Sequence, residues 1–250
     1  MSGHSKWATI HRQKEVNDQK RGQIFTKISN AISLAVREGG NVADPEHNFK
    51  LRLAIEKAKA VNMPKENIQR AIDRVIGRGE GINFVEILYE GYGPGGVGIL
   101  VEAMTDNKQR TVQEVKNVFD RHGGSLASPG AVAFNFVKTG LLVVETVENK
   151  DEIILQLIDL GAEEVEEREA NQLEVYVPAE SLEDFKEKVS HAGLTVKSVE
   201  MVMKPKNLIE ITDPQVATQV MTLMEKLEDL DDIQKVYANC QIPEEVINAN

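Results

Sequence analysis

Apolar residues recur at intervals of three and four over the first third of the chain, the spacing of one face of a helix. Residues 17–38, 44–62 and 64–76 each carry this pattern. The first segment ends at two glycines, which favour a helix C-terminus. The second opens with Asp44 followed by a proline, which indicates an N-cap and a first helical turn, and the third also opens on a proline. Three helices with short connections predict a small bundle.

Beyond the glycine-rich stretch 77–81, where a domain boundary is expected, the apolar period becomes typical of strands. Residues 141–202 follow the order strand, helix, strand, strand, helix, strand of the ferredoxin-like unit. Residues 208–238 predict strand, helix, strand, a piece too short to stand alone, which we expect to pack with residues 82–138. The elements expected in that first part are strands at 85–89, 97–104 and 131–137 and a helix at 111–122.

The sequence therefore predicts an α+β protein of three domains: an N-terminal three-helix bundle plus two α/β-sandwich domains of the ferredoxin-like type, one inserted in the other. The expected boundaries are residues 1–80, residues 81–138 plus 205–250, and residues 139–204. No apolar run approaches the length of a membrane-spanning helix, and the first ten residues lack a secretory signal. With a single cysteine as well, the prediction is a cytoplasmic protein without contact to membranes.

The net charge of −11 is distributed unevenly. Residues 1–80 hold 15 Lys+Arg against 9 Asp+Glu, whereas residues 81–250 hold 14 against 31. A basic module on an acidic body is a common way to orient a protein on a polyanion, because only one end is attracted. The alternative interpretation is that this asymmetry lies within ordinary scatter.

No catalytic constellation emerges, so an enzyme, a cofactor and a metal site are not expected. Residues 93–98, GPGGVG, match a dinucleotide fingerprint, but a predicted strand follows them where the fingerprint requires a helix, so we expect a tight turn. The five histidines lack the spacing of metal ligands. Cys240 has no neighbouring histidine, and we expect it to be a buried small apolar residue.

The positive signal is the placement of basic residues in the first 80 positions. In each expected helix they recur at spacings of four or seven, which predicts a basic stripe opposite the apolar one. The helical candidates for phosphate contact are Lys20, Arg21, Lys27, Arg52, Lys57, Arg70 and Arg74. Before them, Lys6 and Lys14 flank Trp7, and cations around an aromatic suit phosphate contact with base stacking. The alternatives are that the stripes are solvated helix faces and that Trp7 pins the N-terminal arm to the bundle.

Several long motifs, in the same order, cover essentially the whole chain. They are GHSKWATI (3–10), KRGQIFTKIS (20–29), LRLAIEKAKAVNMPKENIQRAI (51–72), YEGYGPGGVGILVEAMTDNKQRT (89–111) and HGGSLASPGAVAFNF (122–136). On these motifs the sequence resembles the YebC/PmpR family. The resemblance implies an N-terminal helical bundle and two α+β domains. The sequence departs from the family pattern at two places. One is the loop GGNVADPEHN, and the other is NKQRT, which stands where the family has a more arginine-rich segment.

The resemblance implies one of two functions, because family members are described as bacterial DNA-binding transcriptional regulators, while others, including a mitochondrial translational activator, act on the ribosome. A chain that begins at GHSKWATI is similar to the bacterial members. The first hypothesis is a non-enzymatic DNA-binding regulator, expected to be a monomer, whose acidic domains orient the protein or contact other factors. The alternative is a ribosome-associated translation factor, in which the bundle binds ribosomal RNA and the loop 105–111, with Lys108 and Arg110, reaches a functional centre.

Overall fold

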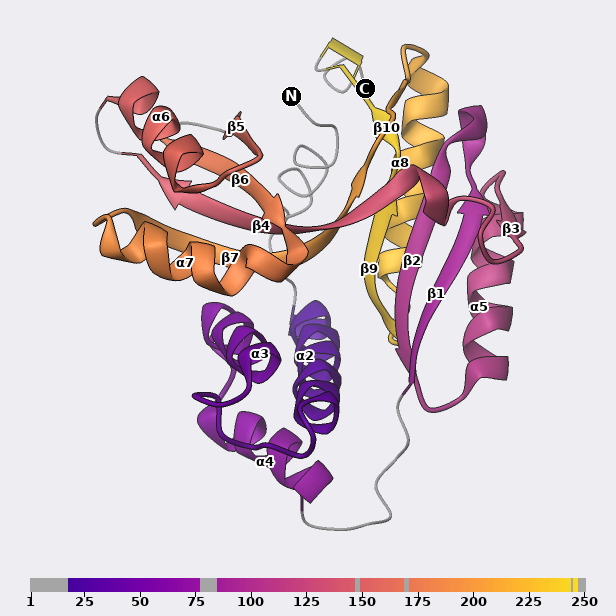
Figure 1. Ribbon diagram of the computed structural model, residues 1–250. Coiled ribbons are helices and arrows are strands. Elements are labelled where there is room, and N and C mark those ends of the chain that lie inside the picture. Colours follow the sequence, from indigo (N-terminus) through magenta and orange to yellow (C-terminus); the bar gives the residue numbers. More distant parts are fainter. Residues whose placement is uncertain (1–17, 77–84, 147–148, 169–170, 244, 247–250) are drawn as a thin grey trace. The chain divides into compact units, whose positions relative to one another are not determined.

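The computed structural model describes residues 18–76, 85–146, 149–168, 171–243 and 245–246, with side chains from residue 22 onward (Figure 1). The chain divides into two compact units, one formed by Asn135–Leu208 and the other by the described parts of Gln13–Phe134 and Ile209–Asn250. The predicted α+β class, with a helical region and two sheet-containing domains, one inserted in the other, is confirmed. No helix of the described segments is long and apolar enough to cross a membrane.

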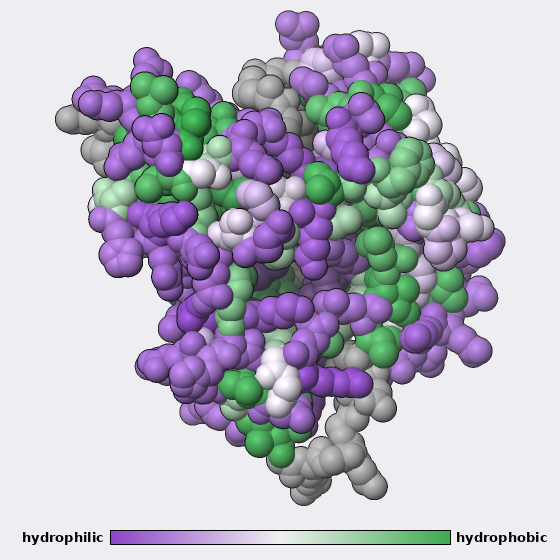
Figure 2. All heavy atoms as spheres, viewed as in Figure 1, coloured by the Kyte–Doolittle hydropathy of each residue, from purple (hydrophilic) through white to green (hydrophobic). Residues whose placement is uncertain are grey.

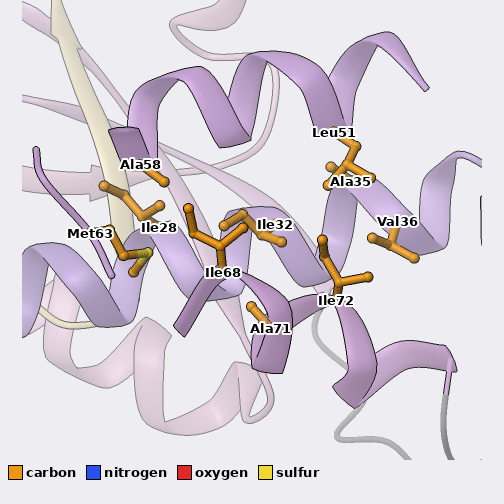
Figure 3. Close-up of a cluster of buried hydrophobic side chains, with 10 residues drawn as sticks. All are labelled: Ile28, Ile32, Ala35, Val36, Leu51, Ala58, Met63, Ile68, Ala71 and Ile72. Atoms are coloured by element: carbon orange, nitrogen blue, oxygen red, sulfur yellow. The ribbon is translucent and has the colours of Figure 1, made fainter. Parts of the chain in front are cut away.

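The N-terminal helices form a bundle around α2. Its members are α2 (Asp18–Glu38), α3 (Phe49–Ala60) and α4 (Lys65–Ile76). Helix α2 packs against both of the others. The core holds side chains from all three, among them Ile32 on α2, Leu51 on α3 and Ile72 on α4 (Figure 3). Because these are the positions of the three-and-four pattern, local sequence defines the buried face of each helix.

The prediction that the second helix begins at Asp44 is wrong, because α3 begins at Phe49 with Asn48 as its N-cap. The Asp44 carboxylate accepts the N–H of Glu46 at 2.9 Å, which closes a turn before the helix. Asn48 is buried, and its Oδ1 accepts the Leu51 N–H at 3.1 Å. Its Nδ2 donates to the carbonyls of Ala35 at 2.9 Å and Val42 at 3.0 Å, so it also satisfies the end of α2. These tertiary contacts favour Asn48 over Asp44 as the cap.

Replacing Asn48 by alanine should lower the free energy of unfolding of the bundle by about 2 kcal/mol, since it removes the cap of α3 and the side-chain donor to the carbonyls of Ala35 and Val42, of which Ala35 keeps the Gly39 N–H. Asn48→Asp keeps the acceptor for the Leu51 N–H but turns a buried carboxylate oxygen toward the two carbonyls, so it should cost at least as much as Asn48→Ala. Hydrogen exchange of the α2 and α3 amides measures both effects. A protection change in Asn48→Ala no larger than in the exposed-site variant Gln69→Ala would contradict this role.

The first sheet has the order β3-β1-β2-β9, with every neighbouring pair antiparallel. Its strands are β1 (Val85–Tyr92), β2 (Gly98–Thr105), β3 (Ser125–Ala127) and β9 (Ile233–Ala238). Helices α5 (Lys108–Arg121) and α8 (Pro214–Glu228) pack against each other and against this sheet. Strand β9 pairs with β2, so the C-terminal segment completes a sheet whose first strand begins at Val85, 148 residues before the start of β9. The strand, helix and strand predicted for residues 208–238 are all present, but the first of them, β8 (Ile209–Glu210), pairs in parallel with β10 (Cys240–Gln241), outside this sheet.

The predicted strand at 131–137 is also wrong. Residues Ala133–Asn135 form a 3₁₀ turn, and β4 (Phe136–Glu145) starts only after it. The backbone N–H groups of Val132 and Ala133 donate to the Glu90 carboxylate and not to a neighbouring strand. An apolar segment can therefore form a loop when a buried carboxylate accepts hydrogen bonds from its backbone N–H groups.

The inserted domain has the ferredoxin-like order that the pattern predicted. Its elements are β4, α6 (Lys150–Leu160), β5 (Glu164–Arg168), β6 (Gln172–Pro178), α7 (Leu182–His191) and β7 (Thr195–Pro205). They form an antiparallel sheet of order β5-β6-β4-β7. Gly140 in β4 lets α7 approach closely, because a Cβ there would lie 2.7 Å from a Leu182 methyl carbon.

Candidate nucleic-acid interface

The nucleic-acid-binding residues predicted in the N-terminal arm lie outside the described residues. This applies to Lys6, Trp7 and Lys14. Lys20 and Arg21 lie in the first turn of α2, where the backbone is described and the side chains are not. Their predicted roles in phosphate contact and base stacking therefore stay predictions.

Two of the predicted phosphate ligands have internal partners. The Lys27 amine donates a hydrogen bond to the Glu228 backbone carbonyl, and burial lowers the pKa of this lysine despite nearby carboxylates. The Arg52 guanidinium lies over the Phe49 ring, 5.3 Å from its centroid, and donates to the Pro45 carbonyl at 3.3 Å. A cation engaged in this way offers less to a phosphate than an exposed one does.

Helix α4 presents the exposed basic face that the sequence predicts. Arg70 and Arg74 are four residues apart, exposed, and opposite the buried apolar positions of this helix. The Arg70 guanidinium lies 3.7 Å from the Glu66 carboxylate, and both side chains are at least 74% exposed. Such a pair is weak in water, so a phosphate can replace the carboxylate. Asp73 lies between the arginines and accepts a hydrogen bond from Gln69, so the face is mixed in charge and not uniformly basic.

Other exposed cations of the bundle complete the surface. Lys57 and Lys59 are exposed on α3, as the spacing of the basic residues predicts. Sequence reasoning missed Arg37 in the last turn of α2 and Lys65 at the start of α4. Both are exposed. Periodicity gives no signal for Lys65, because it shares a helix face with Ile68 and Ile72.

The segment 105–111 is not a free loop. Strand β2 ends at Thr105 and α5 begins at Lys108, so only Asp106 and Asn107 connect them. Asn107 caps the helix by accepting the Arg110 N–H at 3.1 Å. The expected probe loop is thus the N-terminus of a helix.

Arg110 is held by two carboxylates. Its guanidinium donates to Asp232 at 2.8 Å and to Asp106 at 3.1 Å. The hydrogen bond to Asp232, followed by the charges of both carboxylates, raises the pKa of Arg110. Its positive charge is therefore compensated within the fold, whereas Lys108 is exposed at the first helical position.

Asp232 is the centre of this network. It is 7% exposed, and besides Arg110 it accepts hydrogen bonds from the Thr111 hydroxyl at 2.6 Å and the Thr105 hydroxyl at 3.0 Å. Burial opposes ionisation, but the hydrogen bonds from Arg110, Thr111 and Thr105 outweigh it and lower the pKa of Asp232. The start of β9 is thereby fixed to the end of β2 and to α5.

The remaining motifs carry no catalytic geometry. The GPGGVG stretch forms a 3₁₀ turn at Pro94–Gly96, with Gly95 at a φ of 71°, and β2 follows it, so the predicted tight turn is confirmed. Cys240 is buried in β10, as predicted, and burial raises its thiol pKa to about 11, which keeps it protonated at neutral pH. Among the described residues, no three His, Cys, Asp or Glu side chains are grouped to hold a metal ion.

These features define a class of protein: a small helical bundle with an exposed cationic surface, joined to two α+β domains whose polar clusters stabilise the fold. Comparison with known proteins gives the same division. Residues 5–78 match the model of the TACO1/YebC protein N-terminal domain, and residues 84–240 match that of the TACO1/YebC second and third domain. The chain belongs to the TACO1/YebC family, which confirms the membership predicted from its motifs.

Relatives match over nearly their whole length. A "probable transcriptional regulatory protein" of Chloroflexus aurantiacus is 49% identical, covering 99% of this chain and 98% of the relative. A protein of the same name from Moorella thermoacetica is 46% identical with the same coverage. The crystal structure of a conserved hypothetical protein, Aq1575, from Aquifex aeolicus is similar to this one, with a TM-score of 0.84. The two sequences are 40% identical, and the match covers 93% of this chain and 95% of that one. The names of the relatives indicate a regulatory protein and not an enzyme.

Proposed function

We propose that this chain is a non-enzymatic cytoplasmic transcriptional regulator that binds DNA as a monomer through its N-terminal bundle. The observation that carries the proposal is the exposed pair Arg70 and Arg74 on one face of α4; among the described residues, their carboxylate contact is the weak one between Arg70 and Glu66. Guanidinium groups suit phosphate oxygens because they can donate two parallel hydrogen bonds. The names of the relatives support a role in transcription.

The bundle would act chiefly on the DNA backbone. Lys57, Lys59 and Lys65 add exposed charges to the two arginines, and each phosphate neutralised releases a condensed counterion. Affinity through such contacts falls steeply with salt and depends little on base sequence. The acidic remainder of the chain would be repelled by the same duplex, which restricts binding to one orientation.

The double variant Arg70→Glu with Arg74→Glu should reduce DNA affinity at least about 100-fold at low salt, because two attractive charges become repulsive. It should also reduce the slope of log affinity against log salt by about 2. Fluorescence anisotropy with a labelled duplex at several salt concentrations measures both quantities. The fold should persist, since both side chains are exposed.

The matched control is Lys116→Glu on α5 with Lys188→Glu on α7, which reverses the charge of two exposed lysines outside the bundle. It changes the net charge of the chain by the same amount. If this control weakens binding as much as the arginine variant does, general charge explains the affinity and the bundle is not the interface. Affinity that survives in the arginine variant would also exclude α4 from the interface.

A second candidate function is a ribosome-associated translation factor that assists elongation. The specific observation in its favour is that Lys108 stands exposed at the N-terminus of α5, on a segment that Asp232 holds rigid through Thr105 and Thr111. A cation on a rigid support suits a defined position on RNA.

Sedimentation of a cell lysate through a sucrose gradient, with nuclease controls, distinguishes the two functions. Co-migration with intact ribosomes that is lost in Lys108→Glu would favour translation and overturn DNA as the main target. A free or nucleoid fraction without a ribosomal peak would favour the transcriptional regulator. The control Lys116→Glu lies on the same helix, paired with Asp120, and should sediment like the unchanged chain.

A further inference from the structure

Helix α6 of the inserted domain is apolar on two sides. The helix contacts β5 and α7, and on its inner side Leu157 is fully buried. Its outer side carries Leu155 and Ile158, whose exposed fractions are 64% and 50%. Figure 2 shows green apolar side chains at the surface where Figure 1 places α6. These two residues lie three positions apart and so share one face of the helix.

Helix α7 of the same domain provides a comparison, because its solvent-exposed side chains are polar. It buries Leu182, Phe185 and Val189 as α6 buries Leu157. The exposed positions of α7 are all polar: Asp184, Glu187, Lys188, Ser190 and His191. The outer leucine and isoleucine of α6 are therefore not a general feature of this layer, and neighbouring exposed apolar side chains of this kind favour a contact with another molecule.

Carboxylates surround the apolar pair. Asp151 and Asp159 lie four residues before and after Leu155, on the same helix face, and both are exposed. The lysine of this helix, Lys150, is paired with Glu167 at 2.8 Å, so it does not offset them. The domain as a whole, residues 135–208, holds 16 Asp+Glu against 8 Lys+Arg.

We propose that the outer face of α6, formed by Asp151, Leu155, Ile158 and Asp159, docks a cationic amphipathic segment of another protein. The apolar pair would contact the apolar side of that segment, and the two aspartates would pair with its lysines or arginines. The same charges argue against the other occupants. A nucleic acid would be repelled, and a second copy docking by the same face would place carboxylate against carboxylate. The proposal is independent of nucleic-acid binding, because none of these residues lies in the bundle.

Photo-crosslinking in cells that express the full chain tests this surface. The apolar photoreactive residue p-benzoylphenylalanine replaces Leu155 in one version and Lys188 on α7 in the other. We expect a discrete adduct at 155 that is absent at 188. Mass spectrometry of the adduct should map a peptide of another protein that contains both apolar residues and several lysines or arginines.

The charge requirement is tested in the same experiment. Asp151→Asn with Asp159→Asn should lower the adduct yield about threefold or more, whereas Asp184→Asn with Glu187→Gln on α7, an equal change in charge, should leave it unchanged. An adduct with a second copy of this chain, with nucleic acid or with a segment lacking basic residues would overturn the proposal. An adduct yield that is the same with and without Asp151→Asn and Asp159→Asn would also overturn the proposal. The same holds if position 155 gives no more adduct than position 188.

Discussion

Replacing Asp232 by alanine is expected to lower the free energy of unfolding of the domain that contains β1, β2 and β9 by about 3 kcal/mol. The carboxylate is buried and accepts hydrogen bonds from Arg110, Thr105 and Thr111. Both threonines are fully buried, so their hydroxyls would lose a charged acceptor without gaining water. Urea unfolding followed by tyrosine fluorescence measures the loss.

The comparison variant is Asp120→Ala, which removes an exposed aspartate paired with Lys116. It should cost less than about 0.5 kcal/mol, because exposed pairs contribute little. If both variants lose the same free energy of unfolding, Asp232 does not hold α5 and β9 together.

The Asp232 network also predicts a dependence on pH. The pKa of this carboxyl is lowered in the fold, so its ionised form stabilises the protein above the unfolded-state value of about 3.9. That contribution is lost as the pH falls from this value through the lower folded value. Asp232→Asn cannot ionise there, so its stability should fall less between about pH 5 and pH 2 than that of the unchanged chain. Parallel pH profiles would contradict the assignment.

Glu90→Gln is expected to cost about 3 kcal/mol and to release the segment before β4. One carboxylate oxygen accepts the Gly130 N–H at 2.6 Å, and the other accepts those of Val132 at 2.6 Å and Ala133 at 2.7 Å. Glutamine offers one acceptor oxygen, and its amide group would face amide donors. Because Glu90 is 4% exposed, water cannot substitute.

Hydrogen exchange at residues 130–133 measures this release directly, and urea unfolding gives its cost. The matched variant is Glu86→Gln on the same strand, where the side chain is exposed. It should change stability by less than about 0.5 kcal/mol. Unchanged protection of the Val132 and Ala133 amides in Glu90→Gln would show that other contacts hold this segment.

The sequence by itself determined the helices of the bundle and the element order of the inserted domain. Both depend on local periodicity: α4 carries Ile68 and Ile72 on one side and Arg70 and Arg74 on the other, as the spacing alone requires. The basic face of α4 was predictable for the same reason, because a helix fixes which residues share a side. The domain boundary expected at 77–81 lies outside the described residues and stays a prediction.

Only the tertiary structure decided which cations remain available and where some elements begin. Arg110 and its partner Asp232 are 122 residues apart in the chain, and no local pattern connects them. Asp44 and Asn48 are equally good caps by residue type, and the contacts of Asn48 with the end of α2 select it. Residues 131–133 have the apolar character of a strand, but the amides of Val132 and Ala133 donate to the Glu90 carboxylate. Periodicity reports which side of an element is buried, whereas the hydrogen-bond partner of a buried polar group depends on segments that only folding brings together.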